Sequence, residues 1–406
     1  MNIIYLTSLT PYGKGESFVL NEIDALQAMG HRITIIPIRP GTDLEVPGYT
    51  VFRCSAHGLR CYVGAVQTLV KNPVRSLTAC WNMLSKAGSF AKACKNLYFF
   101  PKALAVARYL SEDGTIDFIH SHWLATVSTV GYIVSAITGI PWGMTGHRWD
   151  IYENNAVRKK IETACFLRTI DQRGKRHILS LISEEDRKKV MCIHLGIQIP
   201  SLQKTKRKHQ NTIFHVCMPA FFVKVKGHRY VVEAFRILKQ KNIRDIDCTF
   251  WGEGDLRESI ENQIVREGLQ DWIKIGGYIE NKKLLKAYEE RRYDAVLLPS
   301  LSLSAQEHEG IPVSLMEAMA YEIPVISTNT GGIPELLSKG AGIMIEQKSP
   351  IAIVEALLRL KEDQEFYAAV SQKGRERVSK EFNNELNTQR LLRYFRKPSM
   401  SKRRRP

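Results

Sequence analysis

The second half of the chain alternates short apolar runs with longer amphipathic segments, and this alternation limits the possible folds more than any other feature. The runs TIFHVCMPA, DCTFWG, WIKIGG and DAVLLPS are each separated from the next by a segment of helical character. In the segment 227–240 the apolar side chains recur at helical spacing, at Tyr230, Val231, Ala234, Phe235 and Leu238. Short, continuously apolar strands between helices are typical of a parallel sheet with helices on both faces. The pattern therefore predicts a doubly wound α/β domain.

The first half repeats the pattern around an inserted helical region. Its strands are expected at NIIYLT, HRITIIPI, IDFIHSH, PWGMTGH and VMCIHLG, and the polar, basic stretch IPSLQKTKRKHQN is expected to be a linker. We therefore predict an α/β fold of two Rossmann-like, doubly wound parallel-sheet domains, at residues 1–200 and 201–375. A ligand is expected in an interdomain cleft, at the carboxyl ends of the strands.

One long uncharged stretch, from Trp123 to Gly146, has the length of a membrane span. Its Gly, Ser and Thr residues and the break at TGIP favour a buried helix, a turn and a buried strand instead. The opening MNIIYLTSLT has no basic residue before its apolar run, so we expect that it is not a signal peptide. The eight cysteines include no C-x-x-C pair and several lie in apolar runs, which favours reduced core thiols in a cytoplasmic protein.

The net charge of +17 is unevenly distributed, because residues 46–111 contain no Asp or Glu. This region carries basic and aromatic residues in alternation: Arg53, Arg60, Lys71, Arg75, Lys86, Lys92, Lys95, Lys102 and Arg108, with Trp81, Phe90, Tyr98, Phe99 and Phe100. Such a surface suits an anionic membrane, plain solvent or a nucleic acid. We predict contact with an anionic membrane surface and no nucleic-acid partner, since no recognisable nucleic-acid motif accompanies the charge.

The segment EHEGIPVSLMEAMAYEIPVIST places Glu309 just before a predicted helix and Glu317 one turn inside it. The strand DAVLLPS ends shortly before this segment, and the helix is expected to begin near Pro312, since proline suits a first helical turn. The free N–H groups near Val313 and Ser314, together with the helix dipole, form a site suited to an anion such as phosphate.

The residues around that anion site favour a particular ligand. Gly310 would allow a ligand to approach the backbone closely. A carboxylate at Glu317 would repel a phosphate but can accept hydrogen bonds from neighbouring hydroxyls, as on a ribose. Glu309 would face the other side of the phosphate, where a sugar would lie. The segment therefore predicts a grip on a nucleotide-sugar around its diphosphate, and the alternative is a pair of ordinary surface glutamates.

The segment EHEGIPVSLMEAMAYEIPVISTNTGGIPEL resembles the E-x7-E signature of the family 4 retaining glycosyltransferases, which have the GT-B fold. Other segments along nearly the whole chain are similar to the family, among them TSLTPYGKGESFVLNEIDALQAMGH, HSHWLATVSTVGYIVSAITGIPWGMTGHRWDIY, VKGHRYVVEAF and WGEGDLRESI. The nearest likeness is to members that build exopolysaccharide, capsule or lipopolysaccharide. The fold also implies that a last helix, with the basic tail at residues 376–406, crosses back to the first domain.

The resemblance implies roles for individual residues. His147 and Glu309 are the expected catalytic residues: His147 resembles a histidine that faces the reacting sugar, and Glu309 resembles the residue near that sugar's hydroxyls. Lys226 matches a lysine that neutralises the diphosphate as charge builds on the leaving group. Glu317 resembles the residue that binds the donor ribose. Donor binding extends over the backbone of Gly310, Ile311, Pro312 and Val313, and for His147 a structural role at a strand end is the alternative.

Three further matches are weaker. Gly13 and Gly15 are expected to let the first loop approach the acceptor or the diphosphate. Glu253, between two glycines after a strand, is expected near the base of the nucleotide. The resemblance implies that no metal is bound and no cofactor is needed, because the lysine and the helix dipole carry the charge. Asp245 and Asp247 fit a D-x-D pattern but flank the start of a strand, so we predict that they hold no metal.

Two positions depart from the family pattern. Phe221 stands where many relatives have an arginine, so Lys224 would have to supply that charge, without a bidentate fork. Glu322 stands where relatives usually have glycine at a helix end, and we expect a local cost in stability there.

We expect a retaining glycosyltransferase, peripheral on the inner, cytoplasmic face of a bacterial membrane, in surface polysaccharide synthesis. It would move a hexose or related sugar from a nucleotide-sugar donor to a lipid-linked, oligosaccharide or polysaccharide acceptor. Three alternatives stay open: a sugar-nucleotide epimerase of the same fold, a catalytically silent nucleotide-sugar-binding protein suggested by Phe221, and a nucleic-acid-binding protein suggested by charge alone.

Overall fold

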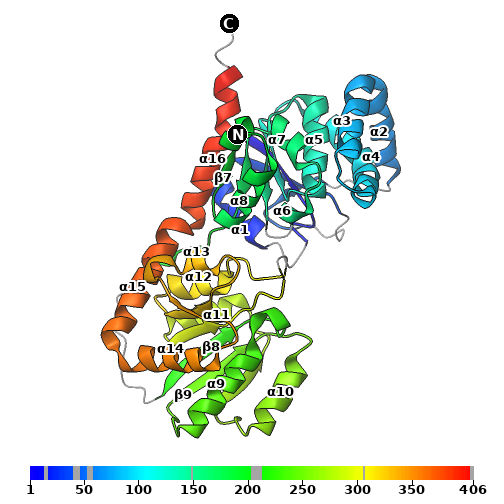
Figure 1. The fold of residues 1–406 in the computed structure, drawn as a ribbon. Helices are drawn as coiled ribbons and strands as arrows, with labels where there is room; N and C mark the ends of the chain where they lie inside the picture. Colours follow the sequence, from blue (N-terminus) through cyan, green and yellow to red (C-terminus); the bar gives the residue numbers. More distant parts are fainter. Residues whose placement is uncertain are drawn as a thin grey trace. The chain divides into compact units, whose positions relative to one another are not determined.

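The computed structural model divides the chain into two compact units (Figure 1). Unit 1 consists of residues 1–196 with 384–406, and unit 2 of residues 197–383. The boundaries expected from the sequence were at 200 and 375. The structure describes residues 1–12, 17–39, 46–52, 58–147, 150–202, 213–304 and 307–402.

Unit 1 is built on a seven-stranded parallel sheet with the strand order β3-β2-β1-β4-β5-β6-β7. Its strands are short and mostly buried, as predicted for a sheet covered on both faces. They are β1 (Asn2–Thr7), β2 (Arg32–Pro37), β3 (Thr50–Val51), β4 (Phe118–His122), β5 (Trp142–Gly146), β6 (Leu167–Thr169) and β7 (Val190–Cys192). The order reverses between β1 and β4, so the segments that follow these two strands diverge and leave room for functional side chains at the carboxyl edge.

The helices of unit 1 cover both faces of this sheet. They are α1 (Ser17–Ala28), α2 (Leu59–Lys71), α3 (Pro73–Ser85), α4 (Phe90–Asp113), α5 (Thr126–Thr138), α6 (Asp150–Glu153), α7 (Val157–Thr163), α8 (Gln172–Leu181) and α16 (Asn384–Lys402), with a 3-10 turn η2 (Glu185–Lys189). The helix α16 comes from the far end of the sequence but packs on this sheet, where the ring of Phe395 stacks 4.8 Å from that of Phe118.

The uncharged stretch 123–146 forms the buried helix α5, a turn and the buried strand β5, which confirms the prediction. The turn is at Gly139, whose φ of 72° lies in the left-handed region that glycine adopts without strain. Within the described ranges, none of the helices combines the length and the apolar character that a membrane crossing needs.

Unit 2 is a second doubly wound parallel sheet, with the order β10-β9-β8-β11-β12-β13. Its strands are β8 (Phe214–Pro219), β9 (Ile246–Trp251), β10 (Ile273–Gly277), β11 (Ala295–Leu298), β12 (Val325–Thr328) and β13 (Ile343–Ile345). The order reverses between β8 and β11, and this brings the loops after those strands to one place. Parallel α/β architecture in both halves confirms the predicted fold class.

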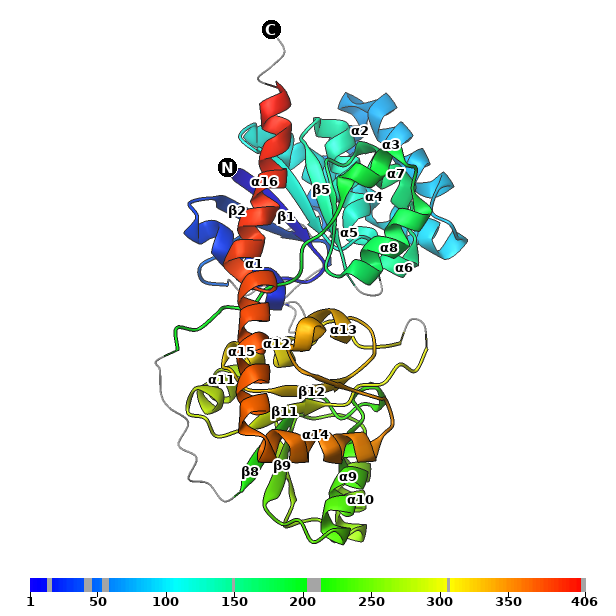
Figure 2. The same cartoon turned by 60° about the vertical axis from the view of Figure 1, so that its left-hand side comes forward.

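The helices of unit 2 alternate with its strands. They are α9 (His228–Gln240), α10 (Arg257–Arg266), α11 (Asn281–Glu289), α12 (Val313–Ala320), α13 (Ile333–Leu336), α14 (Pro350–Glu362) and α15 (Gln364–Glu381), with 3-10 turns η3 (Lys224–Lys226) and η4 (Ser338–Gly340). Figure 2 shows α14 beside α9 under the sheet, and α12 close to the ends of β11 and β12. The predicted helix 227–240 thus agrees with α9 to within one residue.

Candidate functional site

The predicted anion site lies at the start of α12 in unit 2. Pro312 is the residue before the helix and is extended, with φ −70° and ψ 121°, so the first helical residue is Val313. Among the residues that the structure describes, no side chain caps this helix start. The first N–H groups of a helix have no partner within it, so those at Val313 and Ser314 can donate to a ligand, and the helix dipole favours an anionic one.

Lys226 and Glu309 meet beside this helix start. The ammonium of Lys226 contacts Oε2 of Glu309 directly, and both side chains are largely buried. Ser300 also donates to Oε2 at 3.4 Å, and the backbone N–H of Gly310 donates to Oε1 at 3.2 Å. The carboxylate is therefore held in one orientation by contacts from the loops after β8 and β11.

Two glycine turns allow this approach. Gly227, with a φ of 78°, ends η3, and a Cβ there would lie 2.2 Å from the carbonyl oxygen of Pro299. Gly331, with a φ of 57°, packs on the segment that carries Glu309, because a Cβ would lie 1.6 Å from the Glu309 carbonyl oxygen. Sequence reasoning did not single out Gly331, although the pair of adjacent glycines in TNTGGIPEL was a usable signal.

Glu317 lies on α12, one turn after its start, as expected. Asn281, at the start of α11, donates from Nδ2 to Oε1 of Glu317 at 3.0 Å. Burial raises the pKa of the Glu317 carboxyl above its usual value, and the hydrogen bond from Asn281 opposes that rise. Asn281 was not predicted, because only the fold brings the start of α11 next to α12.

The remaining predicted positions of unit 2 lie in the segments that follow β8 and β9. Glu253 accepts two hydrogen bonds from Arg257, at 2.7 and 2.8 Å, and one from the N–H of Tyr278 at 3.2 Å. Its carboxylate thus joins the loop after β9 to the loop after β10. Phe221 is 66% exposed, and Lys224 is exposed as well.

Both D-x-D carboxylates are engaged by other side chains. Asp245 contacts the ammonium of Lys361, and Asp247 contacts Nδ1 of His215 at 2.9 Å. Neither carboxylate lies near the start of α12 in the fold, since both flank the amino-terminal end of β9, opposite to the carboxyl edge that carries Lys226. The absence of a bound metal stays a prediction.

In unit 1 the predicted histidine, His147, follows β5 directly and is buried. Its Nε2 lies 2.9 Å from Nδ1 of His122 at the end of β4. Asp150 fixes the backbone of the two segments that follow β4 and β5. Its carboxylate accepts the N–H of His147 at 2.6 Å and that of Leu124 at 2.5 Å. Burial raises the pKa of Asp150 to about 7, despite these two hydrogen bonds.

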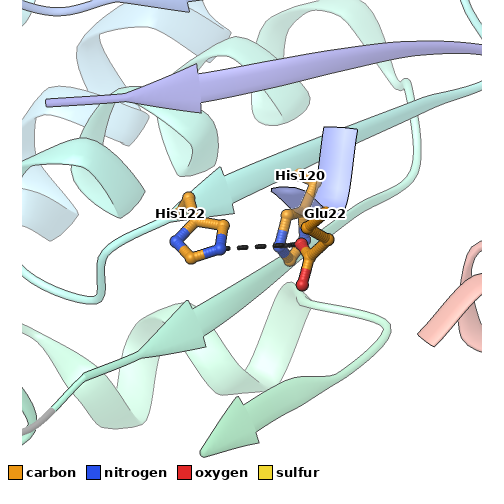
Figure 3. A group of neighbouring side chains, drawn as sticks. All are labelled: Glu22, His120 and His122. Carbon is orange, nitrogen blue, oxygen red and sulfur yellow. Dashed lines mark ion pairs between the residues drawn. The ribbon is translucent and has the colours of Figure 1, made fainter. Parts of the chain in front are cut away.

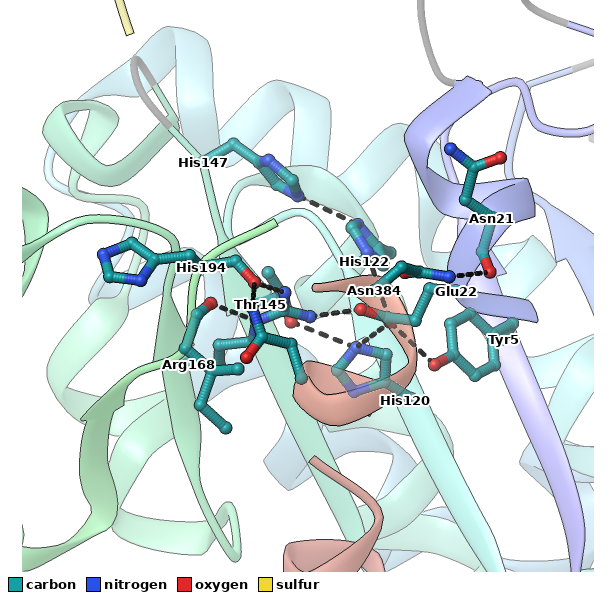
Figure 4. Close-up of polar contacts among 12 residues, drawn as sticks. Tyr5, Asn21, Glu22, His120, His122, Thr145, His147, Arg168, His194 and Asn384 are labelled. Carbon is teal, nitrogen blue, oxygen red and sulfur yellow. Dashed lines mark hydrogen bonds and ion pairs between the residues drawn. The ribbon is translucent and has the colours of Figure 1, made fainter. Parts of the chain in front are cut away.

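A buried polar network extends inward from His147 (Figure 4). Glu22, on α1, is its centre. One oxygen, Oε2, contacts the guanidinium of Arg168 on β6, and the other, Oε1, accepts a hydrogen bond from the hydroxyl of Tyr5 at 2.8 Å. Arg168 also donates to the carbonyls of Ile193 and His194, at 2.7 and 2.9 Å.

The charges in this network are matched. Burial alone would raise the pKa of Glu22, but the Arg168 guanidinium and the neighbouring histidines hold it well below its usual range. Burial holds the pKa values of His120 and His147 well below the ordinary histidine value. Sequence reasoning missed Glu22 and Arg168. The signal available was a charged residue inside an apolar run, as in FLRTI.

Three members of this network have the spacing of metal ligands. Glu22, His120 and His122 present ligand atoms within 4.8 Å of one another (Figure 3). However, the guanidinium of Arg168 already contacts Glu22, and a cation there would be repelled by that positive charge. His120 is also engaged, with its Nε2 3.1 Å from the hydroxyl of Thr145. The contacts thus favour a network of hydrogen bonds over a metal centre.

The acid-free region forms α2, α3 and α4, which lie outside α5 in unit 1 (Figure 1). Helix α2 turns small side chains inward, and a Cβ at its Gly64 would meet Ala105 of α4 at 3.5 Å. The large apolar side chains point to solvent at helical spacing: Leu59, Tyr62, Val63, Val66 and Val70 on α2, and Val74, Leu77 and Trp81 on α3. We call these eight residues the outer stripe.

For one basic residue of this region, the surface location expected from the sequence is wrong. Lys102 is buried, and its ammonium donates to the carbonyls of Pro37 and Ile38 at 2.8 and 2.9 Å. It lies near the middle of α4, and the carbonyls at the end of β2 replace water around its charge. Arg60, Lys71, Arg75, Lys86 and Lys95 are exposed. Gly13, Gly15 and Arg53 lie outside the described residues.

The sequence of this chain is similar to those of known proteins. Residues 201–377 match the family model described as glycosyl transferases group 1. The amylovoran biosynthesis glycosyltransferase AmsK of Erwinia amylovora is 31% identical over 204 residues, which is 50% of this chain and 49% of that protein. The putative colanic acid biosynthesis glycosyltransferase WcaL of Salmonella typhimurium is 26% identical over 93% of this chain and 95% of its own length. The chain thus spans about half of AmsK and nearly all of that WcaL.

Solved structures share the fold. Anabaena Alr3699/HepE, crystallised in complex with UDP, superposes with a TM-score of 0.71 at 17% identity, covering 97% of this chain and 99% of that one. A glycosyltransferase from Rickettsia africae superposes with a TM-score of 0.69 at 18% identity, covering 97% of both chains. Together with the two parallel sheets, these likenesses establish the GT-B fold.

Proposed function

We propose that this chain, whose residues 201–377 match the glycosyl transferases group 1 family, transfers a sugar from a nucleotide-sugar donor to a carbohydrate or lipid-linked acceptor. The observation that carries the proposal is the arrangement of Lys226, Glu309 and the start of α12 in unit 2. Relatives named for amylovoran and colanic acid biosynthesis support an acceptor in exopolysaccharide synthesis.

The start of α12 supplies what a diphosphate needs. The N–H groups at Val313 and Ser314, which have no partner within the helix, donate to phosphate oxygens, and the helix dipole stabilises the negative charge of those oxygens. Lys226 lies beside that position and adds a full positive charge. As the bond between the sugar and the diphosphate breaks, negative charge grows on the leaving group, so a fixed cation there stabilises the transition state more than the ground state.

Glu309 and Glu317 play different parts in this proposal. Glu317 is held by Asn281 and accepts hydrogen bonds from the ribose of the nucleotide. Glu309 is held by Lys226, Ser300 and the N–H of Gly310, and it accepts hydrogen bonds from hydroxyls of the transferred sugar. A diphosphate that binds near Lys226 brings a second anion to that lysine, so the Lys226–Glu309 contact weakens as the donor binds. No metal ion and no cofactor are part of this proposal.

The outer stripe and the basic residues around it suit a membrane surface. The stripe includes Val70 and Trp81, with exposed fractions of 73% and 69%, and it continues over two consecutive helices. Lys71, Arg75 and Lys86 flank it and are exposed. Exposed apolar side chains enter the boundary between headgroups and acyl chains, and the lysine and arginine side chains pair with anionic headgroups. We therefore place unit 1 at an anionic membrane, where a lipid-linked acceptor would be found.

The thiols support a proposed location in a reducing compartment. Cys61, Cys217 and Cys248 are buried thiols, and burial raises the pKa of the Cys217 and Cys248 thiols. The described cysteines form no disulfide, which suits a reducing compartment. We therefore place the protein at the cytoplasmic face of the membrane.

The test begins with a donor screen. UDP-sugars are the first candidates, because HepE was crystallised with UDP and with UDP-glucose. Thermal unfolding is followed with each nucleotide-sugar and with its free nucleotide, because a ligand that binds the folded state raises the unfolding temperature. The donors that bind are then incubated with the protein and an oligosaccharide or lipid-linked acceptor. A new glycosidic product supports the proposal. An isomerised donor without a product would assign an epimerase, and binding without turnover would assign a silent binding protein.

A further inference from the structure

We infer that Glu22 and His122 are positioning residues that set the tautomer of His147, so that Nε2 of His147 carries its hydrogen and Nδ1 presents a lone pair. The inference rests on the proposed function in one respect, because His147 is assumed to serve sugar transfer. It goes beyond that function by naming two residues, neither of them expected to touch the donor, that determine what His147 can do.

The chain of contacts that leads to His147 starts at Arg168. Its guanidinium contacts Oε2 of Glu22, and both side chains are buried, so the carboxylate stays ionised. Tyr5 donates its hydroxyl hydrogen to Oε1 of Glu22 at 2.8 Å. A fixed negative charge thus lies inside unit 1, next to the carboxyl end of β4 (Figure 4).

This charge orients His122. Its Nε2 lies 3.6 Å from Oε1 of Glu22, at a distance longer than a strong hydrogen bond but close for an electrostatic contact. A lone pair on Nε2 would face the carboxylate and be repelled, whereas an N–H there is attracted. His122 therefore carries its hydrogen on Nε2, and its Nδ1 is left as an acceptor.

His122 in turn orients His147. Nε2 of His147 lies 2.9 Å from Nδ1 of His122. Since Nδ1 of His122 is the acceptor, Nε2 of His147 is the donor, and a neutral His147 then has its lone pair on Nδ1.

A lone pair on Nδ1 has a use in sugar chemistry. Among the described residues, none forms a hydrogen bond with Nδ1 of His147. It can accept a hydrogen bond from a sugar hydroxyl, whereas the other tautomer can only donate to one. The backbone of His147 is fixed independently by Asp150, so the ring and the backbone are held by separate contacts.

Two variants of similar size test the inference. In His122→Asn the amide oxygen can take the place of Nδ1 and accept from His147, whereas His122→Leu has no acceptor. The ring nitrogens of His147 are observed by 15N NMR in the substrate-free protein, with signals assigned by their loss in His147→Ala. We expect the Nε2–H tautomer in the parent and in the Asn variant, and a mixture of tautomers in the Leu variant.

Turnover should follow the tautomer. We expect kcat of the Leu variant to be about 10-fold lower than that of the Asn variant, because residues that orient a functional side chain from behind it typically contribute about 10-fold or more. KM for the donor should differ by no more than about twofold. His120→Gln is the control, because His120 shares the network with Glu22 but makes no hydrogen bond to His147. It should change the unfolding temperature without changing the tautomer or reducing kcat by more than about threefold.

The role of Glu22 is tested by comparing the effect of its substitution in the parent and in a His122 variant. Glu22→Gln should lower kcat in the parent but have little further effect in the His122→Leu background, because Glu22 acts through His122. If Glu22→Gln does not fold, the two His122 variants decide alone. An Nδ1–H tautomer in the parent, or equal kcat for the Asn and Leu variants, would overturn the inference. A parent that transfers no sugar would refute the proposed function, while the NMR result would still decide the tautomer.

Discussion

The ammonium of Lys226 contacts the carboxylate of Glu309, although the two residues lie 83 positions apart in the chain. The contact joins the loop after β8 to the loop after β11, the two loops that the reversal of strand order brings together. Both groups are more than four-fifths buried, so their charges depend on each other.

We expect Lys226→Met to destabilise the fold by about 3 kcal/mol, because it leaves the Glu309 carboxylate buried without a cation. The double variant Lys226→Met with Glu309→Gln should recover at least half of that loss, since no charge is then left unpaired. Urea titrations of the parent, the single variants and the double variant measure the free energies of unfolding. Additive losses would show that the two groups do not interact.

Glu317 and Glu309 should differ in their effects on binding and turnover. Glu317→Ala removes an acceptor for ribose hydroxyls, so affinity for the free nucleotide should fall by about 1.5–3 kcal/mol. Glu309→Ala should mainly lower kcat and leave nucleotide affinity nearly unchanged. Calorimetric titration and initial rates measure the two quantities. Glu355→Ala, on the exposed side of α14, is the control. Parent-like binding and turnover in both variants would remove the donor site from this segment.

Vesicle binding should depend on the position of the positive charges. Replacing Lys71, Arg75 and Lys86 by Gln should weaken binding to vesicles that contain anionic lipid by about two orders of magnitude, at about 1 kcal/mol per charge. A matched variant replaces Lys241, Arg244 and Lys282, which are exposed on unit 2, and should bind as the parent does.

The outer stripe should contribute separately to the same binding. Val70→Ser with Trp81→Ser removes apolar surface without changing the charge, so binding should fall even at high salt, where charges are screened. Sedimentation with vesicles of neutral and of mixed anionic lipid separates the two effects. If neither set of changes alters sedimentation, unit 1 does not bind membranes through this face.

Acid should destabilise unit 1 below about pH 6.5, the ordinary pKa of histidine. Burial holds the pKa values of His120 and His147 well below that value, so between it and the folded pKa the unfolded chain binds protons that the folded chain does not. Each histidine therefore contributes stability that is full above about pH 6.5 and is lost on acidification by about 1.4 kcal/mol per pH unit. Asp150, whose pKa burial raises to about 7, takes up a proton in the folded state over the same range and offsets about one of the two histidines. Hydrogen exchange of β4 and β5 amides from pH 7.5 to 5 measures this slope. His120→Asn should reduce this slope by the contribution of about one proton. An unchanged slope would contradict the low pKa assigned to His120.

Glu322 offers a test of backbone strain. Its φ of 57° is in the left-handed region, which costs a non-glycine residue about 1–2 kcal/mol. Its carboxylate lies 3.1 Å from Arg291, but the pair is partly exposed and contributes less than about 1 kcal/mol. We therefore expect Glu322→Gly to stabilise unit 2 slightly, as measured by urea denaturation. A loss of stability would show that the ion pair outweighs the strain.

The sequence by itself determined the class of fold and predicted the place of the proposed donor site. The spacing of apolar residues depends on local geometry, so the strands around DAVLLPS and the helix 227–240 could be predicted without long-range contacts. The positions of Glu309, Pro312 and Glu317 relative to a strand end and a helix start are local as well. For the same reason the uncharged stretch 123–146 could be divided into a helix and a strand.

Only the tertiary structure decided which distant residues meet. Lys102 belongs to a basic, aromatic region by sequence, yet its ammonium is buried against the carbonyls at the end of β2. Glu22, His122 and Arg168 come from α1, β4 and β6, and no local pattern relates them. Their contact follows from the order of strands in the sheet and from burial, which forces each charge to find a partner. That requirement acts only once the chain is folded, so it leaves little trace in local sequence.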